Sequence, residues 1–177
     1  MAENNQANWK IDTGHSEIQF KVKHLAISNV AGTFKVFSGG MLTKNEDFDG
    51  AVVNCIIDVS SLDTNNTQRD GHLKSEGFFN PQKFPEITFE GQLKKKNDDY
   101  ELAGDLTIRE TTKHIVMEAE LTGTGKGRFN DTRAGFEITG KITRKDFGLT
   151  WNILTEAGGL VIGEDIKLHF DIELIKE

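Results

Sequence analysis

Residues 165–175 read Asp-Ile-Lys-Leu-His-Phe-Asp-Ile-Glu-Leu-Ile, an alternation of polar and apolar side chains that continues to Leu174. Successive side chains of a β-strand point to opposite faces, so this period of two predicts a strand with one apolar and one polar face. A parallel sheet covered on both faces would instead give continuous apolar runs. The stretch therefore predicts an antiparallel sheet with one face in a core and the other in water.

The same alternation recurs along the rest of the chain. It predicts further strands at residues 9–12, 16–24, 32–37, 51–59, 85–90, 102–109, 113–121 and 134–143. Turns are expected at Ser38-Gly39-Gly40, Asn45-Glu46-Asp47, Asn97-Asp98-Asp99, Gly123-Thr124-Gly125 and Asn130-Asp131, where Gly, Asn and Asp supply turn geometry. Eight or nine such strands favour an all-β closed barrel or a sandwich. Eight strands close around an interior that holds side chains or one ligand.

Two segments break the alternation, residues 62–80 and 146–160. In the first, Thr64 or Asn65 is expected to cap a short helix that ends before Asn80-Pro81. We interpret both segments as lids over the ends of a barrel. Without an internal repeat or a linker, the chain is predicted to form a single domain, 1–177, with residues 1–8 disordered.

Composition excludes several classes of function. The 28 acidic residues against 21 Lys and Arg give a net charge of −7, which repels phosphate backbones, so nucleic-acid binding is not expected. The sequence contains no apolar run of about 18 residues, so it predicts no transmembrane helix. The first residues do not resemble a signal peptide, so a cytoplasmic location is expected, or a periplasmic one if an export signal had been removed. The single cysteine, Cys55, shares its strand face with Val53 and Ile57 and is interpreted as a small buried hydrophobe.

Catalytic motifs are absent from the sequence. It contains no Gly-x-Ser-x-Gly elbow, no phosphate loop and no dinucleotide-binding glycine turn. The five histidines are dispersed, and none is paired at metal-ligand spacing. We therefore expect no enzyme, no cofactor and no bound metal.

Three polar side chains are candidates for contact with a ligand headgroup: His24, Arg69 and His72. His24 continues the apolar row of Phe20 and Val22, so it either bonds a loop carbonyl at the strand end or meets a headgroup at a cavity mouth. Arg69 and His72 lie in residues 69–74, where dense charge can clamp an anionic head such as a diphosphate. The alternative is a local network of Arg69 and Asp70 that fixes the lid. An acid–base pair of Asp70 and His72 has no nucleophile beside it.

Several spaced motifs resemble one known family. They are residues 9–25, from Trp-Lys-Ile-Asp to Lys-His-Leu, then 30–34, 62–80, 83–89, 104–109, 144–149 and 161–166. On these motifs the chain is similar to the YceI-like family of lipid- or polyisoprenoid-binding proteins. It departs from the family pattern at residues 109–113, which read Arg-Glu-Thr-Thr-Lys where the family has Arg-Gly-Val-Thr-Lys.

The resemblance implies an extended antiparallel lipocalin-like β-barrel of about eight strands with one or two short helical lids around an apolar tunnel. It also implies isoprenoids, quinones or fatty amides as ligands, with no catalytic residues to carry over, and a homodimer is an expectation from the resemblance alone. The expected tunnel lining is taken from the inward rows: Phe20, Val22, Phe34, Val36, Val53, Ile57, Ile87, Phe89, Leu106, Ile108, Ile115, Met117, Phe136, Ile138, Leu168, Phe170 and Ile172.

The predicted function is binding and carriage or sequestration of a long-chain apolar lipid. Each methylene moved from water into such a tunnel gains about 0.8 kcal/mol. Two alternatives remain open at this point: a stress-related structural or interaction protein with a filled core, and an enzyme that modifies a lipid.

Overall fold

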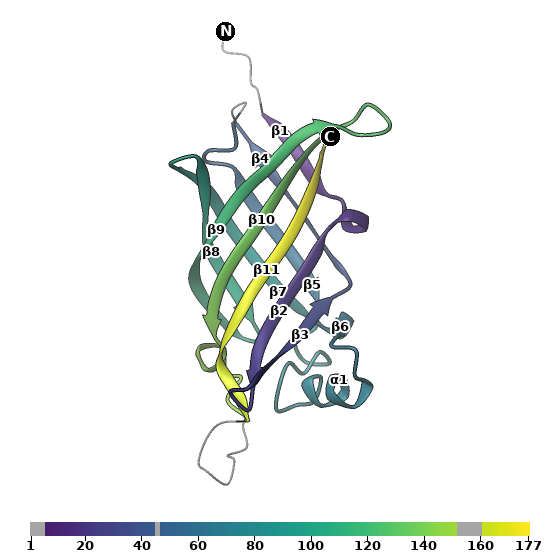
Figure 1. Ribbon diagram of the computed structural model, residues 1–177, viewed down its shortest axis with the longest axis vertical. Helices are drawn as coiled ribbons and strands as arrows, with labels where there is room; N and C mark the ends of the chain where they lie inside the picture. The colour runs from purple at the N-terminus through teal and green to yellow at the C-terminus, as the bar shows by residue number, and fades with distance from the viewer. Residues whose placement is uncertain (1–5, 45–46, 152–160) are drawn as a thin grey trace.

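The computed structural model describes residues 6–44, 47–151 and 161–177, which form a β-barrel with eleven strands and one α-helix (Figure 1). The strands are β1 (Ala7–Ile11), β2 (Glu17–His24), β3 (Ser28–Phe34), β4 (Phe37–Thr43), β5 (Val52–Asp58), β6 (Leu62–Asp63), β7 (Glu86–Lys96), β8 (Asp99–Ile108), β9 (Thr111–Lys126), β10 (Thr132–Thr143) and β11 (Ile162–Lys176). The helix α1 is Thr67–Leu73, and the 3-10 turns are η1 (Thr13–His15), η2 (Val59–Ser61) and η3 (Arg144–Phe147).

Eight of these strands close into a ring. Their order is β1-β4-β5-β7-β8-β9-β10-β11, and β11 pairs back to β1, with every pairing antiparallel. The predicted lipocalin-like antiparallel barrel of about eight strands is therefore confirmed. In the described part of the chain, no helix is long and apolar enough to cross a membrane.

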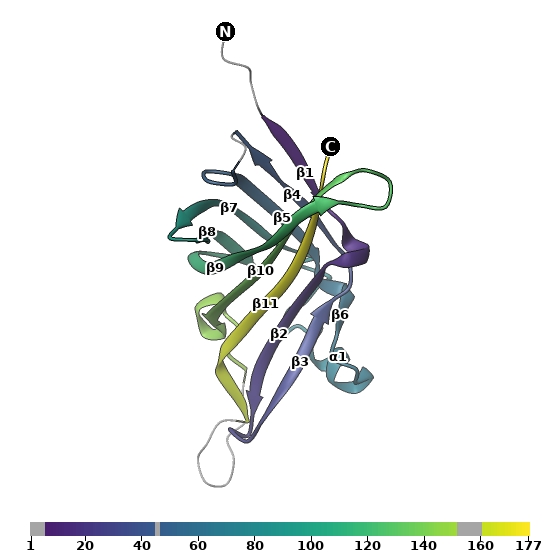
Figure 2. The ribbon, with the colours of Figure 1, turned by 45° about the horizontal axis from the view of Figure 1, so that its top comes forward.

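The long strand β11 has two neighbours on the same edge. Its last residues, from Leu174 to Lys176, pair with β1, whereas its lower part, from Ile162 to Asp171, pairs with β2. From β2 the sheet continues through β3 to β6, outside the ring. Figure 2 shows this branch beside β11 at the lower end of the barrel, with α1 next to β6.

The upper end of the barrel is closed by aromatic side chains. Phe48, from the connection between β4 and β5, lies 5.4 Å from the ring of Trp9 and 5.2 Å from that of Phe136, both edge to face. Tyr100 packs against Phe48 and Phe136 as well. Phe48 is 5 % exposed, so these edge-to-face contacts fill this end of the barrel.

Two of the expected turns are wrong because their glycines lie inside strands. Gly39 and Gly40 belong to β4, where a Cβ would collide with the carbonyl oxygens of Asn54 and Trp9, respectively, on the neighbouring strands. These glycines serve close strand approach rather than chain reversal. Residues 123–125 lie within β9, beside a β-bulge opposite Gly135.

Other turns form where expected. Asn97 and Asn130 adopt left-handed conformations between strands, with φ of 56° and 62°. Residues 45–46 of another expected turn lie outside the described residues. Residues 1–8 were expected to be disordered. Residues 7 and 8 instead belong to β1, where Ala7 pairs with Thr43 and Asn8 with Leu42. Residues 1–5 lie outside the described part.

The first expected lid contains α1. Its N-cap is Asn66, whose side chain accepts a hydrogen bond from the backbone N–H of Arg69, so neither Thr64 nor Asn65 is the cap. Of the second expected lid, residues 146–160, the structure describes 146–151, which include the end of η3.

We expect Phe48→Ala to lower the free energy of unfolding by about 3–5 kcal/mol, because it leaves a cavity among packed aromatic rings. Urea unfolding followed by circular dichroism measures this loss. The matched control is Phe129→Ala, since Phe129 is 84 % exposed and its truncation should change stability by about 0.5 kcal/mol or less. Equal effects of the two substitutions would contradict the closed upper end.

Candidate functional site

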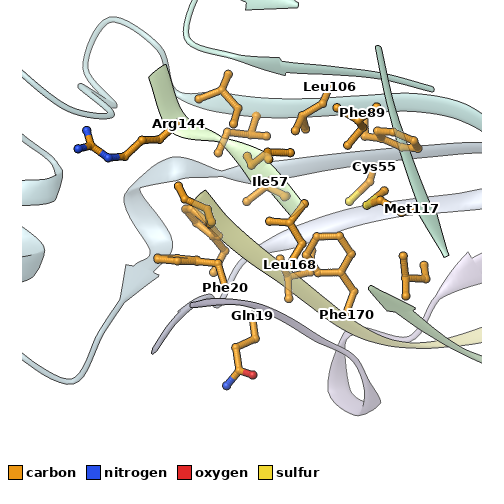
Figure 3. A pocket seen from close by; sticks show the side chains of 18 of the residues that line it. Gln19, Phe20, Cys55, Ile57, Phe89, Leu106, Met117, Arg144, Leu168 and Phe170 are labelled. Carbon is orange, nitrogen blue, oxygen red and sulfur yellow. The ribbon is translucent and has the colours of Figure 1, made fainter. Parts of the chain in front are cut away.

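A cavity of about 380 Å³ lies inside the barrel. It extends from Ile11 and Leu174 to Phe78 and Trp151, and its walls are the inner faces of the strands. In Figure 3, side chains of opposite walls point toward a common space, with Phe89 and Leu106 on one side and Leu168 on the other. The volume falls within the range of about 300–1,000 Å³ that is typical of small-molecule sites.

Part of the inner wall is only half-buried although its side chains point inward. This is so for Phe20 on β2, Ile57 on β5 and Phe170 on β11, all of which line the cavity. By contrast, Met117 and Phe136 are each 4 % exposed. Inward side chains keep accessible surface where the space before them is unfilled, so the barrel is hollow rather than packed throughout.

All but one of the predicted lining residues border this cavity: Phe20, Val22, Phe34, Val53, Ile57, Ile87, Phe89, Leu106, Ile108, Ile115, Met117, Phe136, Ile138, Leu168, Phe170 and Ile172. The exception is Val36, which is 56 % exposed. The expected strand 32–37 is broken between β3 and β4, and the inward positions change from Phe34 to Phe37 across the break. Strict alternation of inward and outward positions across this break assigns Val36 to the inner face, whereas its side chain is exposed.

Arg69 both lines the cavity and holds the lid. Its Nε donates to the Thr64 hydroxyl at 2.8 Å and its Nη2 to the Thr64 carbonyl at 2.7 Å. Asp70 accepts from the Thr64 backbone N–H at 2.9 Å and from its hydroxyl. The network expected between Arg69 and Asp70 thus runs through the buried Thr64, which ties α1 to β6.

His72 also borders the cavity, in an aromatic cluster at its lower end. Its ring lies 4.5 Å from that of Trp151 and 5.5 Å from that of Phe78. His24 lines the cavity from the end of β2 and is exposed. The three headgroup candidates therefore all lie on the cavity wall, His24 and His72 toward its lower end.

Arg144 is a lining residue that the sequence analysis did not select. It is 2 % exposed and donates to the carbonyls of Leu149, Trp151, Ile162 and Gly163. Burial lowers the pKa of Arg144, and nearby Glu164 opposes that shift. In the described residues Arg144 forms no ion pair, and Glu164 pairs with Lys145 instead. Backbone dipoles therefore solvate the charge of Arg144, and its guanidinium links η3 to β11. The sequence did contain a signal for this position, because Arg144 continues the period-two row of inward residues Phe136, Ile138 and Ile142.

Cys55 faces the cavity from β5, as its shared row with Val53 and Ile57 predicted. The thiol is half-buried because its accessible surface faces the hollow. Burial raises the pKa of Cys55 to about 12.

Among the residues that the structure describes, two groups of side chains on the outer wall have ligand atoms close enough to hold a metal ion. In the first, Arg133 donates to Asp12 at 2.7 Å and to Glu173 at 2.5 Å, so its guanidinium occupies the space between the carboxylates. His15 and Arg133 lower the pKa of Asp12 through hydrogen bonds to its charged form. The second group is Glu137, His169 and Asp171, on β10 and β11. Neither group faces the cavity.

Comparison with known proteins matches the YceI-like domain over residues 9–174. The chain belongs to the YceI-like family. A UPF0312 protein of Yersinia pestis is 39% identical over 170 residues, which cover 94% of this chain and 85% of that protein.

Solved structures of other proteins are similar to this YceI-like chain. The YCEI protein of Campylobacter jejuni is 34% identical, with a TM-score of 0.72 and coverage of 88% of this chain and 90% of that one. A polyisoprenoid binding domain from Saccharophagus degradans shares the fold at 16% identity, with a TM-score of 0.69 and coverage of 96% and 98%.

We expect the Cys55 thiol to react at least a hundredfold more slowly with iodoacetamide in the native protein than in guanidinium at pH 8. A pKa of about 12 keeps it in the unreactive neutral form, whereas the unfolded thiol has a pKa near 8.5. Because the thiolate is the nucleophile, the native rate should rise about tenfold for each pH unit. Mass spectrometry of timed samples measures both rates, and fast labelling at pH 7 would show that Cys55 does not face a dry cavity.

Proposed function

We propose that this YceI-like protein binds a long-chain apolar lipid inside the barrel and sequesters or carries it without chemical change. The observation that carries the proposal is the hollow itself, with inward apolar rows that remain half-buried on β2, β5 and β11. A lipid chain would cover this surface. The polyisoprenoid binding domain from Saccharophagus degradans, which shares the fold, supports an isoprenoid chain as the ligand class.

The cavity volume sets the scale of the ligand. An apolar cavity of about 150 Å³ holds one benzene, so 380 Å³ accommodates roughly 15 carbons. Fifteen methylenes at about 0.8 kcal/mol each give about 12 kcal/mol gross. Ordering of the ligand and loss of its free motion offset about 4 kcal/mol or more of this gain. Apolar burial discriminates weakly between chains, so we propose that length matters more than the positions of double bonds.

We place the polar end of the ligand at the lower end of the cavity. The upper end is filled by the aromatic rings around Phe48, whereas the lower end offers Arg69, His72 and His24. Arg69 bonds to Thr64 through Nε and Nη2, and within the part of the chain that the structure describes its Nη1 has no hydrogen-bond partner, so this group can donate to an oxygen of a headgroup. The bonds to Thr64 fix the guanidinium in place for that contact.

Two alternatives are less well supported. A structural protein with a filled core does not account for a cavity of 380 Å³. An enzyme that uses Asp70 with His72 does not account for the hydrogen bonds of the Asp70 carboxylate, which accepts from Thr64 twice. The cavity and the hydrogen bonds of Asp70 to Thr64 therefore favour a binding function over a catalytic one.

The direct test is native mass spectrometry of the purified protein, followed by extraction with organic solvent. We expect an apolar adduct of defined mass that solvent releases. Bare protein under gentle conditions, together with no uptake of added farnesol (a fifteen-carbon isoprenoid alcohol), would overturn the proposal.

A matched pair of variants locates the ligand. Cys55→Trp places a large ring in the cavity and should lower farnesol binding at least tenfold, measured by displacement of fluorescent parinaric acid. Val116→Trp adds the same ring on the outer face of β9, where Val116 is 52 % exposed, and should leave binding unchanged. Circular dichroism checks that both variants fold. Equal binding by both would place the ligand elsewhere.

A further inference from the structure

The turn between β2 and β3 is apolar and exposed. Leu25 and Ala26 have φ of 53° and 56°, and Ile27 is 82 % exposed while Leu25 is 39 % exposed. Left-handed backbone is unfavourable for bulky residues, and a turn with positive φ at both central residues favours Asn-Gly. Elsewhere in the described residues, the other non-glycine positions with positive φ are Asn65, Asn80, Asn97, Arg109 and Asn130. The residues at the tip of this hairpin are therefore unfavourable for the conformation of its backbone.

This apolar tip adjoins the lower end of the cavity. The backbone N–H of Leu25 donates to the carbonyl of Val161 at 2.9 Å, and His24 pairs with Ile162. His24, Val161 and Ile162 all line the cavity. Figure 1 shows the β2–β3 hairpin at the lower end of the barrel. The tip therefore lies beside the end at which we place the polar part of the ligand.

A row of lysines crosses the outer wall above the tip. Lys21 on β2 is directly opposite Lys167 on β11, which is directly opposite Lys141 on β10. Like charges in such cross-strand positions destabilise a sheet. Lys23 lies closer to the tip on β2 and borders the cavity. The carboxylates near this row are Asp165, 3.5 Å from Lys141, and Glu118 on β9, which lies opposite Thr139. Glu164 pairs with Lys145 beside Asp146.

A row of carboxylates crosses the same wall farther from the tip. Glu120, Glu137, Asp171 and Glu17 are successive cross-strand partners on β9, β10, β11 and β2. On β2, β10 and β11 the two rows are four residues apart, or about 13 Å. This exceeds the Debye length of about 10 Å at 0.1 M salt, so a charged surface held against the lysines is screened from the carboxylates.

We propose that this end of the barrel docks on an anionic lipid bilayer. Leu25 and Ile27 enter the interface between headgroups and acyl chains, and Lys21, Lys141 and Lys167 face the anionic headgroups. The carboxylate row points away, so a chain with a net charge of −7 still approaches in one orientation. Docking brings the cavity end next to a source or acceptor of its lipid, although the surface itself does not depend on a bound ligand.

A bilayer fits these features better than a protein partner does. The apolar area is small and projects at a hairpin tip, where it can enter a fluid interface without a shaped pocket. The lysines are spread over three strands, which suits a diffuse negative surface, where each contributes about a fivefold gain in partitioning. A second copy of the chain is the other outcome that the experiment distinguishes.

The test is sedimentation of the full chain with vesicles of phosphatidylglycerol and phosphatidylcholine, compared with phosphatidylcholine alone. We expect binding only to the anionic vesicles and its loss in 0.5 M NaCl. Lys21→Gln with Lys167→Gln should weaken binding about 25-fold. The control, Lys94→Gln with Lys95→Gln at the opposite end of the barrel, removes the same charge and should change binding less than twofold.

The variant Leu25→Asn with Ile27→Ser tests the apolar tip. Vesicle binding should fall at least tenfold, while thermal stability stays equal or rises because Asn tolerates the left-handed backbone. Parinaric acid binding should be unchanged, so failure of vesicle binding and failure of the cavity proposal are separate results. Wild-type affinity in either variant, or an equal loss in the lysine control, would overturn the proposal. Sedimentation velocity tests whether the surface instead binds a second copy of the chain. If both variants abolished a dimer without affecting vesicle binding, the proposal would also be overturned.

Discussion

The hollow of this protein depends on the pairing of β11 with two strands along one edge. The upper residues of β11 hydrogen-bond to β1 and close the eight-stranded ring, and the lower residues pair with β2. Closure satisfies the backbone groups of both edges and separates an inner face from water. Only then do rows of apolar side chains that fail to meet across the middle enclose a space. An open sheet with the same residues would fold that face against itself.

The two ends of the barrel are built differently. At the upper end, aromatic rings around Phe48 pack edge to face and leave little space. At the lower end, hydrogen bonds hold the covering elements in place: Thr64 fixes α1, and Arg144 joins the segment after η3 to β11 through two carbonyls of each. The upper end is thus closed by packed rings, whereas polar tethers hold the elements that border the cavity at the lower end.

Strand periodicity was sufficient to predict an all-β barrel or sandwich, and the family resemblance indicated the barrel. Periodicity also predicted nearly all of the inner wall, because side-chain direction in a strand is fixed by the backbone. It failed at Val36, where a corner between two strands shifts the parity, and at Gly39 and Gly40, where small residues permit close backbones rather than a turn. Arg144 was accessible to the same reasoning, but its charge argued against an inward position. The bonds of Arg69 to Thr64 could not be foreseen, since they depend on how α1 meets β6 in space.

The branch of β2, β3 and β6 lies outside the closed ring. The hydrogen bonds that close the ring do not involve β2, β3 or α1, whereas Phe20 and Val22 of this branch and Arg69 and His72 of α1 line the cavity. The architecture thus separates the strands that close the barrel from the elements that shape the lower wall of the cavity.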